Sequence, residues 1–106
     1  MAHTSVWISY DLGIRGDYQG LYAWLDSHKA KECGDSVALL KFQHTGPLHE
    51  RLKAELKTKL ETDKRTRIYV IYQDANNRVV GRFLFGGRRS GAWTGYAPSQ
   101  SDTVDE

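Results

Sequence analysis

The sequence predicts an α+β fold in which two helices pack against one face of an antiparallel sheet. Short segments rich in β-branched and aromatic residues are typical of strands, and two longer segments between them carry apolar residues at helical spacing. At 106 residues there is room for one domain, and 40% hydrophobic with 26% charged residues is an ordinary globular composition. We expect this domain to span residues 1–98 and to be followed by an acidic, disordered tail over 99–106.

The first strand and the first helix are read directly from residue types. Residues 5–11, SVWISYD, have the aromatic and β-branched character of a strand. Asp17 stands at the N-cap position of the following helix, where its carboxylate can accept from free backbone N–H groups. The helical spacing i, i+3, i+4, i+7 is shared by Tyr18, Leu21, Tyr22 and Leu25.

Two strands and a second helix follow. We expect a short polar edge strand, a turn at Gly34-Asp35 and a central strand from Val37 to Phe42. Pro47 suits the first position of the second helix, because the N–H that proline lacks would be unpaired there. One apolar stripe of this helix is formed by Leu48, Leu52, Leu56 and Leu60.

The sequence ends its predicted sheet with a hairpin. The segments RIYVIYQ and RVVGRFLF flank DANN, whose asparagines tolerate the positive φ of a tight turn. In the second of these strands one face is shared by Arg78, Val80, Arg82 and Leu84, and the other by Val79, Gly81, Phe83 and Phe85. We expect the second set to face the core and the arginines to lie on the outer face.

The resulting element order is β-α-β-β-α-β plus a final strand. It is the ferredoxin-like pattern, in which the first and third strands are central. The runs VWISY and VALLKF, which would take those positions, are the most apolar strand candidates of the first half.

Charge and aromatic content favour a nucleic-acid partner. Without the acids of the tail, fifteen basic residues stand against ten acidic ones. Arginines bind phosphates through two hydrogen bonds, and aromatic rings stack on bases. We therefore predict contacts with DNA or RNA from Arg78, Arg82, Arg88 and Arg89, with Trp93 and Tyr96 available for stacking and the lysines of the second helix as weaker candidates. The alternative is a solvated sheet face.

Asp11 is the candidate metal ligand and catalytic residue. It ends the first strand, and its carboxylate could bind Mg²⁺ or Mn²⁺, which favour oxygen ligands. One carboxylate makes a poor site, so a two-fold dimer would have to bring two copies together. The alternative is that Asp11 ends the strand by accepting hydrogen bonds from N–H groups of its own loop.

Other chemistry finds little support in the sequence. The single cysteine, Cys33, excludes an internal disulfide and a cysteine-based zinc cluster in one chain. His28 and His49 are expected to be solvated at helix ends, and GGRRSG lacks the lysine and context of a phosphate-binding loop. No cofactor beyond Mg²⁺ is suggested. With no apolar run long enough for a membrane span and no secretory signal, we expect a cytoplasmic protein.

Several segments together resemble the SinR-like branch of the Cas-two-like superfamily, Cas-two being the small CRISPR-associated protein of spacer acquisition. They are ISYDL, DYQGLYAWLD, CGDSVALLKF, the leucine-striped helix, RIYVI and AWTGY, and they span about residues 5 to 97. The resemblance implies a ferredoxin-like homodimer and a divalent metal at Asp11 across the dimer axis. The hairpin QDANNRVVGRFLFGG is longer and more aromatic than the ending usual in that family.

The resemblance also implies a role for the C-terminal segment SGAWTGYA, residues 90–97. It would form an extra strand that pairs with the partner subunit, with Gly86 and Gly87 allowing the bend and Trp93 and Tyr96 in the dimer interface.

Three hypotheses of function follow. The leading one is a homodimeric, nucleic-acid-associated protein without catalysis. The second is a Mg²⁺-dependent endonuclease that uses paired Asp11 carboxylates. The third is a protein-interaction or toxin–antitoxin module that pairs through the AWTGY segment.

Overall fold

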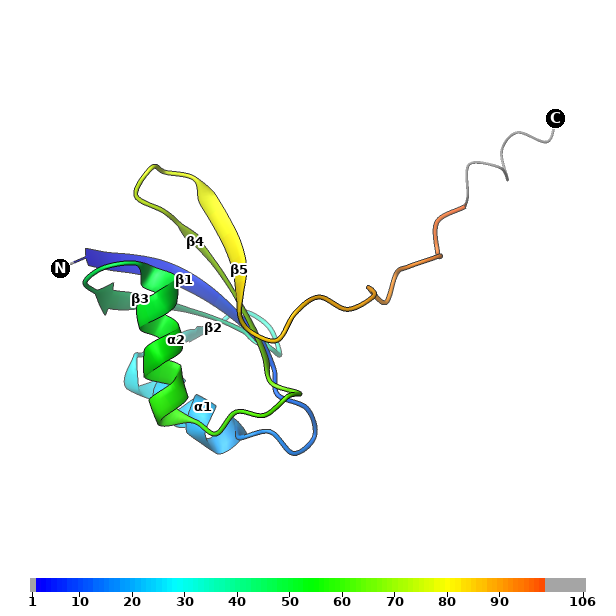
Figure 1. Ribbon diagram of the computed structural model, residues 1–106, viewed down its shortest axis with the longest axis horizontal. Coiled ribbons are helices and arrows are strands. Elements are labelled where there is room, and N and C mark those ends of the chain that lie inside the picture. Colours follow the sequence, from blue (N-terminus) through cyan, green and yellow to red (C-terminus); the bar gives the residue numbers. More distant parts are fainter. Residues whose placement is uncertain (1, 99–106) are drawn as a thin grey trace.

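The computed structural model describes residues 2–98. The elements, in chain order, are β1 (Ala2–Asp11), α1 (Tyr18–Ser27), β2 (Lys31–Glu32), β3 (Val37–His44), α2 (Leu48–Lys59), β4 (Arg67–Gln73) and β5 (Val79–Phe85). Figure 1 shows the two helices on one side of the sheet and the C-terminal segment leading away from both. The predicted α+β class with an antiparallel sheet and two helices is confirmed. The predicted tail over 99–106 lies outside the described residues.

The five strands form one antiparallel sheet in the order β2-β3-β1-β4-β5. β1 is the middle strand, and it pairs with β3 from Ala2 to Ser9 and with β4 from Val6 to Asp11. β1 and β3 are interior strands, as predicted. β4 is interior as well, because β5 pairs with its outer edge, and this fifth strand departs from the four-stranded ferredoxin-like sheet.

The core lies between the helices and one face of the sheet. Along β1 and β4, alternate residues are fully buried, among them Val6, Ile8 and Val70, because successive side chains of a strand point to opposite faces. The predicted leucine stripe of α2 is confirmed, since all four of its leucines are buried. Pro47, predicted as the first helical residue, is instead the N-cap of α2, one position before the helix begins at Leu48.

Helix α1 presents a slightly different face from the predicted one. Trp24 is buried, whereas Tyr22 is 50% exposed, with an edge contact to Tyr10 and a tilted contact to Tyr18. Trp24 belongs to the core because its Nε1 donates to Glu55 of α2 over 2.6 Å, which satisfies the polar atom of a buried ring. His28 lies at the C-terminal end of α1 as predicted, but it is only partly solvated: its side chain is 26% exposed and its Nε2 lies 3.0 Å from the same carboxylate.

The N-terminus of helix α1 and the turn between β4 and β5 follow the predicted local chemistry. The carboxylate of Asp17 accepts from the Gly20 N–H over 2.9 Å, so the predicted N-cap is confirmed. Asn77 in the β4–β5 turn has a φ of 63°, a left-handed conformation that asparagine tolerates. The Asp74 carboxylate accepts from the N–H groups of Asn76 and Arg78 and holds this turn closed.

The predicted faces of β5 are reversed for residues 79–84, whereas Phe85 packs against the core as predicted. Val80 is paired with Tyr72 and Arg82 with Val70, and both partners are buried on the helix-bearing side of the sheet. Leu84 is buried on that side too, and it is the extra residue of an irregularity at which Phe83 and Phe85 pair with consecutive residues of β4. Such a bulge breaks the alternation of faces.

The predicted strand over residues 90–97 does not form in this chain. Backbone hydrogen bonds from Thr94 to Gly91 and from Tyr96 to Trp93 close two turns instead. Trp93 is 79% exposed and Tyr96 85% exposed, so neither ring packs on the domain. None of the helices described in residues 2–98 has the length and apolarity that a bilayer crossing demands.

Candidate nucleic-acid interface

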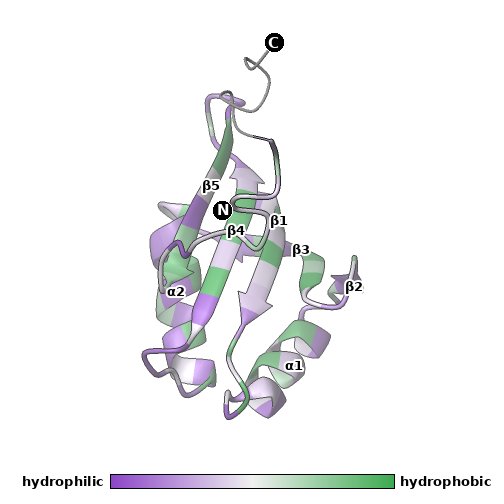
Figure 2. Ribbon diagram, turned by 90° about the vertical axis from the view of Figure 1, so that its right-hand side faces the viewer, coloured by the Kyte–Doolittle hydropathy of each residue, from purple (hydrophilic) through white to green (hydrophobic). Residues whose placement is uncertain are grey.

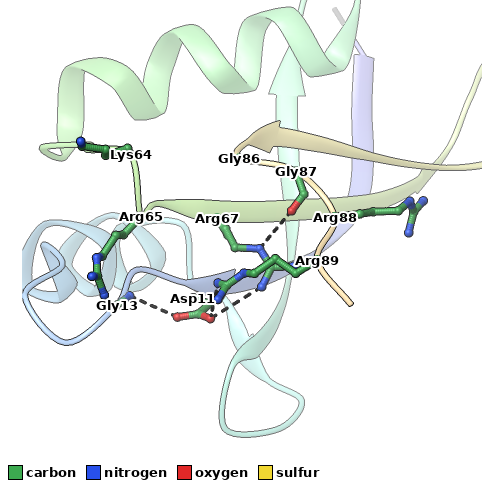
Figure 3. A pocket seen from close by; sticks show the side chains of 9 residues that line it. All are labelled: Asp11, Gly13, Lys64, Arg65, Arg67, Gly86, Gly87, Arg88 and Arg89. Carbon is green, nitrogen blue, oxygen red and sulfur yellow. Dashed lines mark hydrogen bonds and ion pairs between the residues drawn. The ribbon is translucent and has the colours of Figure 1, made fainter. Parts of the chain in front are cut away.

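Asp11 closes strand β1 at one end of the sheet, directly opposite Arg67 of β4. Its Oδ1 accepts from the Gly13 N–H over 3.1 Å, and its Oδ2 lies 3.2 Å from Arg89 Nη2 and 3.8 Å from Arg67 Nη1 (Figure 3). The contact with Gly13 is the strand-ending role expected as the alternative to metal binding. Asp11 thus holds its loop and gathers two arginines.

The surface around Asp11 is a hollow of 570 Å³ lined mainly by cations, which we call the basic hollow. Its charged lining consists of Asp11, Lys64, Arg65, Arg67, Arg88 and Arg89, and its remaining lining of Gly13, Gly86 and Gly87. Five cations against one carboxylate leave an excess of positive charge in a concave surface, which attracts anions. Arginine forks in particular match the geometry of phosphate.

Local backbone chemistry brings these cations to one place. Asp63, in the loop after α2, accepts from the Arg65 N–H over 2.8 Å, so the loop turns tightly before β4 begins. Gly86 follows β5 with a φ of 77°, and a Cβ there would lie 2.8 Å from the Thr66 carbonyl oxygen. Arg67 Nε donates to the Gly87 carbonyl over 3.2 Å, which returns the chain to the hollow.

A second hollow adjoins the basic hollow on the open face of the sheet, the face without helices. The two share Asp11, Arg67 and Arg88, and the second adds the rings of Tyr69 and Phe83. These two rings meet edge to face with centroids 4.7 Å apart. The Arg67 guanidinium carbon lies 5.7 Å from the Phe83 centroid, and that of Arg88 lies 5.9 Å from both rings. Cations therefore border an aromatic surface.

Strand register explains why these rings are neighbours. Tyr69 of β4 is paired with Ser9 of β1 on one side and with Phe83 of β5 on the other, so all three side chains share the open face. Gly81 gives Tyr69 room on this face, because a Cβ at position 81 would collide with the tyrosine hydroxyl. Figure 2 shows β1, β4 and β5 side by side, with apolar and polar residues alternating along them.

The four arginines predicted to contact nucleic acid fall into two groups. Arg88 and Arg89 lie in the basic hollow. Arg78 precedes the seven residues of β5, so about 20 Å of strand separates it from the hollow. Arg82 lies on the helix-bearing side and lines a different hollow with Leu48 of α2. The structure thus assembles one pair of the predicted residues and leaves the other two apart.

The basic hollow contains three cations that the sequence prediction missed. Lys64, Arg65 and Arg67 belong to the run DKRTR, which joins α2 to β4. That run of charge between a helix and a strand was the available signal. Its meeting with residues 86–89 depends on the pairing of β4 with β5, which places the start of one strand beside the end of the other.

The titratable groups near the site carry no sign of a metal centre. Within residues 2–98, no three His, Cys, Asp or Glu side chains gather in a way that could hold a metal ion. Asp11 supplies one carboxylate, and two arginines are already close to it. Burial and the neighbouring Tyr22 phenol raise the pKa of Tyr10, the residue before Asp11, above its ordinary value of 10.0.

Comparisons with known proteins identify no relative of this chain. No family model matches the chain, and the searches of curated proteins and of solved structures likewise find no match.

Proposed function

We propose that this protein associates with nucleic acid, as a homodimer, and that the basic hollow is its phosphate-binding surface. The observation that carries the proposal is the gathering of five cations around one carboxylate at the end of the sheet. Phosphates are the ligand class that such a surface attracts, and neutralising them releases condensed counterions. The proposal assigns binding to the hollow and no catalytic step.

The ion pair between Asp11 and Arg89 in the hollow could be replaced by contacts with a phosphate. Asp11 and Arg89 are 55% and 60% exposed, and exposed ion pairs contribute little stability. A phosphate entering the hollow would replace one weak pair with several charge-assisted hydrogen bonds. Arg65 and Lys64 have no carboxylate within ion-pair distance in the described part of the chain and would be available from the start.

Fluorescence anisotropy with labelled DNA and RNA tests the proposal. We expect binding that weakens steeply between about 50 mM and about 200 mM salt. The variants Arg65→Ala and Arg88→Ala should each weaken it and reduce the slope of log affinity against log salt by about 0.7 to 0.9. Arg78→Ala, which removes an arginine outside the hollow, is the matched control and should leave the slope unchanged. No binding of either nucleic acid at low salt would overturn the proposal.

Substitution of Asp11 separates binding from the metal-dependent endonuclease. If the hollow binds phosphate, Asp11→Asn removes its one negative charge and should preserve or increase affinity. If two Asp11 carboxylates hold Mg²⁺, the same variant should abolish a cleavage activity that also requires the metal. Cleavage of a labelled substrate by wild type, lost on chelation and in Asp11→Asn, would replace the binding proposal with the nuclease.

The proposal of a homodimer is supported by the exposed C-terminal segment, residues 90–97, which we expect to lie in the dimer interface. Trp93 and Tyr96 offer large rigid apolar surfaces that nothing in the described chain covers, and such rings are enriched in interfaces. Light scattering should give the mass of two chains for wild type and of one chain for a version ending at Arg89. Ending the chain there keeps the basic hollow. A monomeric wild type would remove the dimer and leave the binding proposal standing.

The same segment favours a second candidate, a protein-interaction or toxin–antitoxin module. The outer edge of β5 is unpaired in the described chain and could add a strand from another protein. This candidate predicts a stably co-purifying protein that is lost from the version ending at Arg89.

A relation to the Cas-two-like superfamily and its ferredoxin-like fold is part of the proposal. It is supported by the order β2-β3-β1-β4, by two helices on one face and by an aspartate at the end of β1. The added strand β5 is the departure from that pattern. An experimental structure of the dimer, compared with members of that superfamily, would test the relation.

A further inference from the structure

We propose that the nucleic acid is single-stranded and that its bases stack on the open face of the sheet. This inference rests on the proposed function and names the substrate form. Three rings form the stacking surface: Trp7, Tyr69 and Phe83. Phosphates of the same strand lie in the adjoining basic hollow, so the two hollows act as one binding surface.

The open face has the chemistry that base stacking needs. Trp7 is 42% exposed on the middle strand, while Tyr69 and Phe83 are half-buried on the next two strands. Trp7 lies diagonally across from Tyr69, since Trp7 is paired with Ile71 and Ser9 with Tyr69. Diagonal neighbours are about 7 to 8 Å apart, a step that an unstacked strand can span. Every base presents a π-face, so such a platform accepts many sequences.

The positive charge around the rings favours nucleic acid, which carries phosphates, over an uncharged apolar partner. Arg67 and Arg88 approach the rings at 5.7 to 5.9 Å, near the outer limit of a cation–π contact, and can move toward a phosphate at little cost. Lys41 lies on the same face, beside the middle strand opposite Ser5. The acid at this end of the face, Asp11, already contacts two arginines. A second copy packed face to face would bring equal cationic sets together.

The stacking surface fits single strands and does not fit duplexes. In a duplex the base faces are covered by their neighbours, so a flat aromatic platform reaches only the backbone and edges. An unpaired strand exposes both its bases and its phosphates, and alternating contacts to rings and arginines use both. The basic hollow alone would bind either form. The rings therefore supply the preference.

The test compares labelled single strands of about twelve nucleotides with a duplex of equal length, at one low salt concentration. One single strand is oligo-dT and the other oligo-U, which also separates DNA from RNA. We expect either single strand to bind more tightly than the duplex. Phe83→Leu and Tyr69→Leu should each weaken single-strand binding by at least about fivefold and leave duplex binding nearly unchanged.

The matched control removes a ring from the same strand on the other side of the sheet. Phe85 packs against the core, so Phe85→Leu makes the same chemical change without touching the platform. It should leave single-strand affinity within about twofold of wild type, provided that circular dichroism shows a folded protein. An equal loss in Phe83→Leu and Phe85→Leu would mean that the effect is structural and would overturn the platform.

Trp7 provides a direct readout that needs no destabilising substitution. In a Trp93→Phe background the remaining tryptophans are Trp7 and the buried Trp24. A base stacked on Trp7 quenches its fluorescence, so single-stranded DNA or RNA should quench the emission and the duplex should not. Equal quenching by both forms, or none, would overturn the platform.

The outcomes distinguish this inference from the proposed function. Salt-dependent binding that responds to Arg88→Ala but not to Phe83→Leu keeps the basic hollow and overturns the stacking surface. Phe83→Leu or Tyr69→Leu could instead reduce the solution mass from two chains to one without changing the affinity for single strands. The open face would then be a self-association surface, and the stacking proposal would be overturned as well. Failure of every oligonucleotide to bind would remove both.

Discussion

The two faces of the sheet are built from the same strands and used in opposite ways. On β1, Val6 and Ile8 are fully buried against the helices, whereas Trp7 between them is 42% exposed on the other face. On β4, Val70 is fully buried and its neighbour Ile71 is 40% exposed. Both faces carry large apolar side chains. Only one of them is covered within the described chain.

This difference separates what folding needs from what folding leaves available. The helix-bearing face removes its apolar surface from water and so stabilises the fold. The open face retains rings beside cations, which folding alone does not require, and exposed apolar surface of this kind commonly marks a binding site. We therefore assign stability to one face and ligand binding to the other.

The largest expected effect compares two isoleucines of β4. Ile68 is fully buried on the helix-bearing face, so Ile68→Ala should lower the free energy of unfolding by about 2 to 5 kcal/mol. Ile71 is on the open face, and Ile71→Ala should cost about 1 kcal/mol or less. Urea unfolding of both variants measures the difference. Equal losses would mean that the open face is also packed, for example in a dimer.

A smaller effect concerns the polar contact that joins the helices. Glu55 accepts from Trp24 Nε1 over 2.6 Å and lies 3.0 Å from His28 Nε2. Glu55→Ala leaves a buried indole N–H without its acceptor and should cost about 1 to 3 kcal/mol in urea unfolding. Glu50→Ala, an exposed position of the same helix, serves as the control. A change no larger than the control's would show that water replaces the carboxylate.

Asp17 makes the stability of the helix layer depend on pH. Its carboxylate accepts from the N–H groups of Glu61 and Gly20, and these two bonds lower its pKa below the ordinary value of 3.8. A lowered folded-state pKa means that the charged form stabilises the fold above pH 3.8 and that this contribution is lost as the pH falls through the folded-state pKa.

Melting temperatures of wild type and Asp17→Asn against pH test this linkage. The asparagine can cap the helix but cannot accept both bonds, so we expect the variant to melt lower near neutral pH. The difference should shrink as the pH falls below 3.8. Asp26→Asn, at an exposed position of the same helix, controls for the loss of one charge. A difference that stays constant with pH would refute the linkage.

The smallest expected effect on stability lies on the open face. A Cβ added by Gly81→Ala would collide with the Tyr69 hydroxyl, the far end of a side chain that can turn aside. We expect the free energy of unfolding to change by about 0.5 kcal/mol or less. Because the ring moves, single-strand affinity should nevertheless fall. Unchanged affinity in this folded variant would argue against a role for the Tyr69 ring.

Local patterns in the sequence predict most of the fold. The leucine stripe of α2, the cap at Asp17 and the left-handed Asn77 follow from spacing and residue chemistry within a few positions. The buried face of α1 is less determined, because a helical stripe containing Tyr22 and one containing Trp24 differ by a small rotation. Contact between Trp24 and Glu55 of the other helix decides between them.

The candidate site depends on information that no single segment contains. Simple alternation groups the side chains of β5 correctly up to Leu84, but pairing with β4 decides which group faces the helices. The bulge at Leu84 then places Phe85 on the helix-bearing side as well, and nothing in the sequence of that strand marks it. The basic hollow joins residues near position 65 with residues near position 88 because β4 and β5 pair antiparallel. Asp11 and the arginines at positions 88 and 89 were predicted, but as parts of separate sites.

The most direct test of the account is a titration of isotope-labelled protein with oligo-dT, followed by backbone amide chemical shifts. We predict that the shifts concentrate at the end of β1, the start of β4, the end of β5 and residues 86–89, around Asp11, Tyr69 and Phe83. Helices α1 and α2 should stay nearly unchanged. Shifts that instead map to the helices, or to Arg78 and Arg82, would contradict the assignment of ligand binding to the open face.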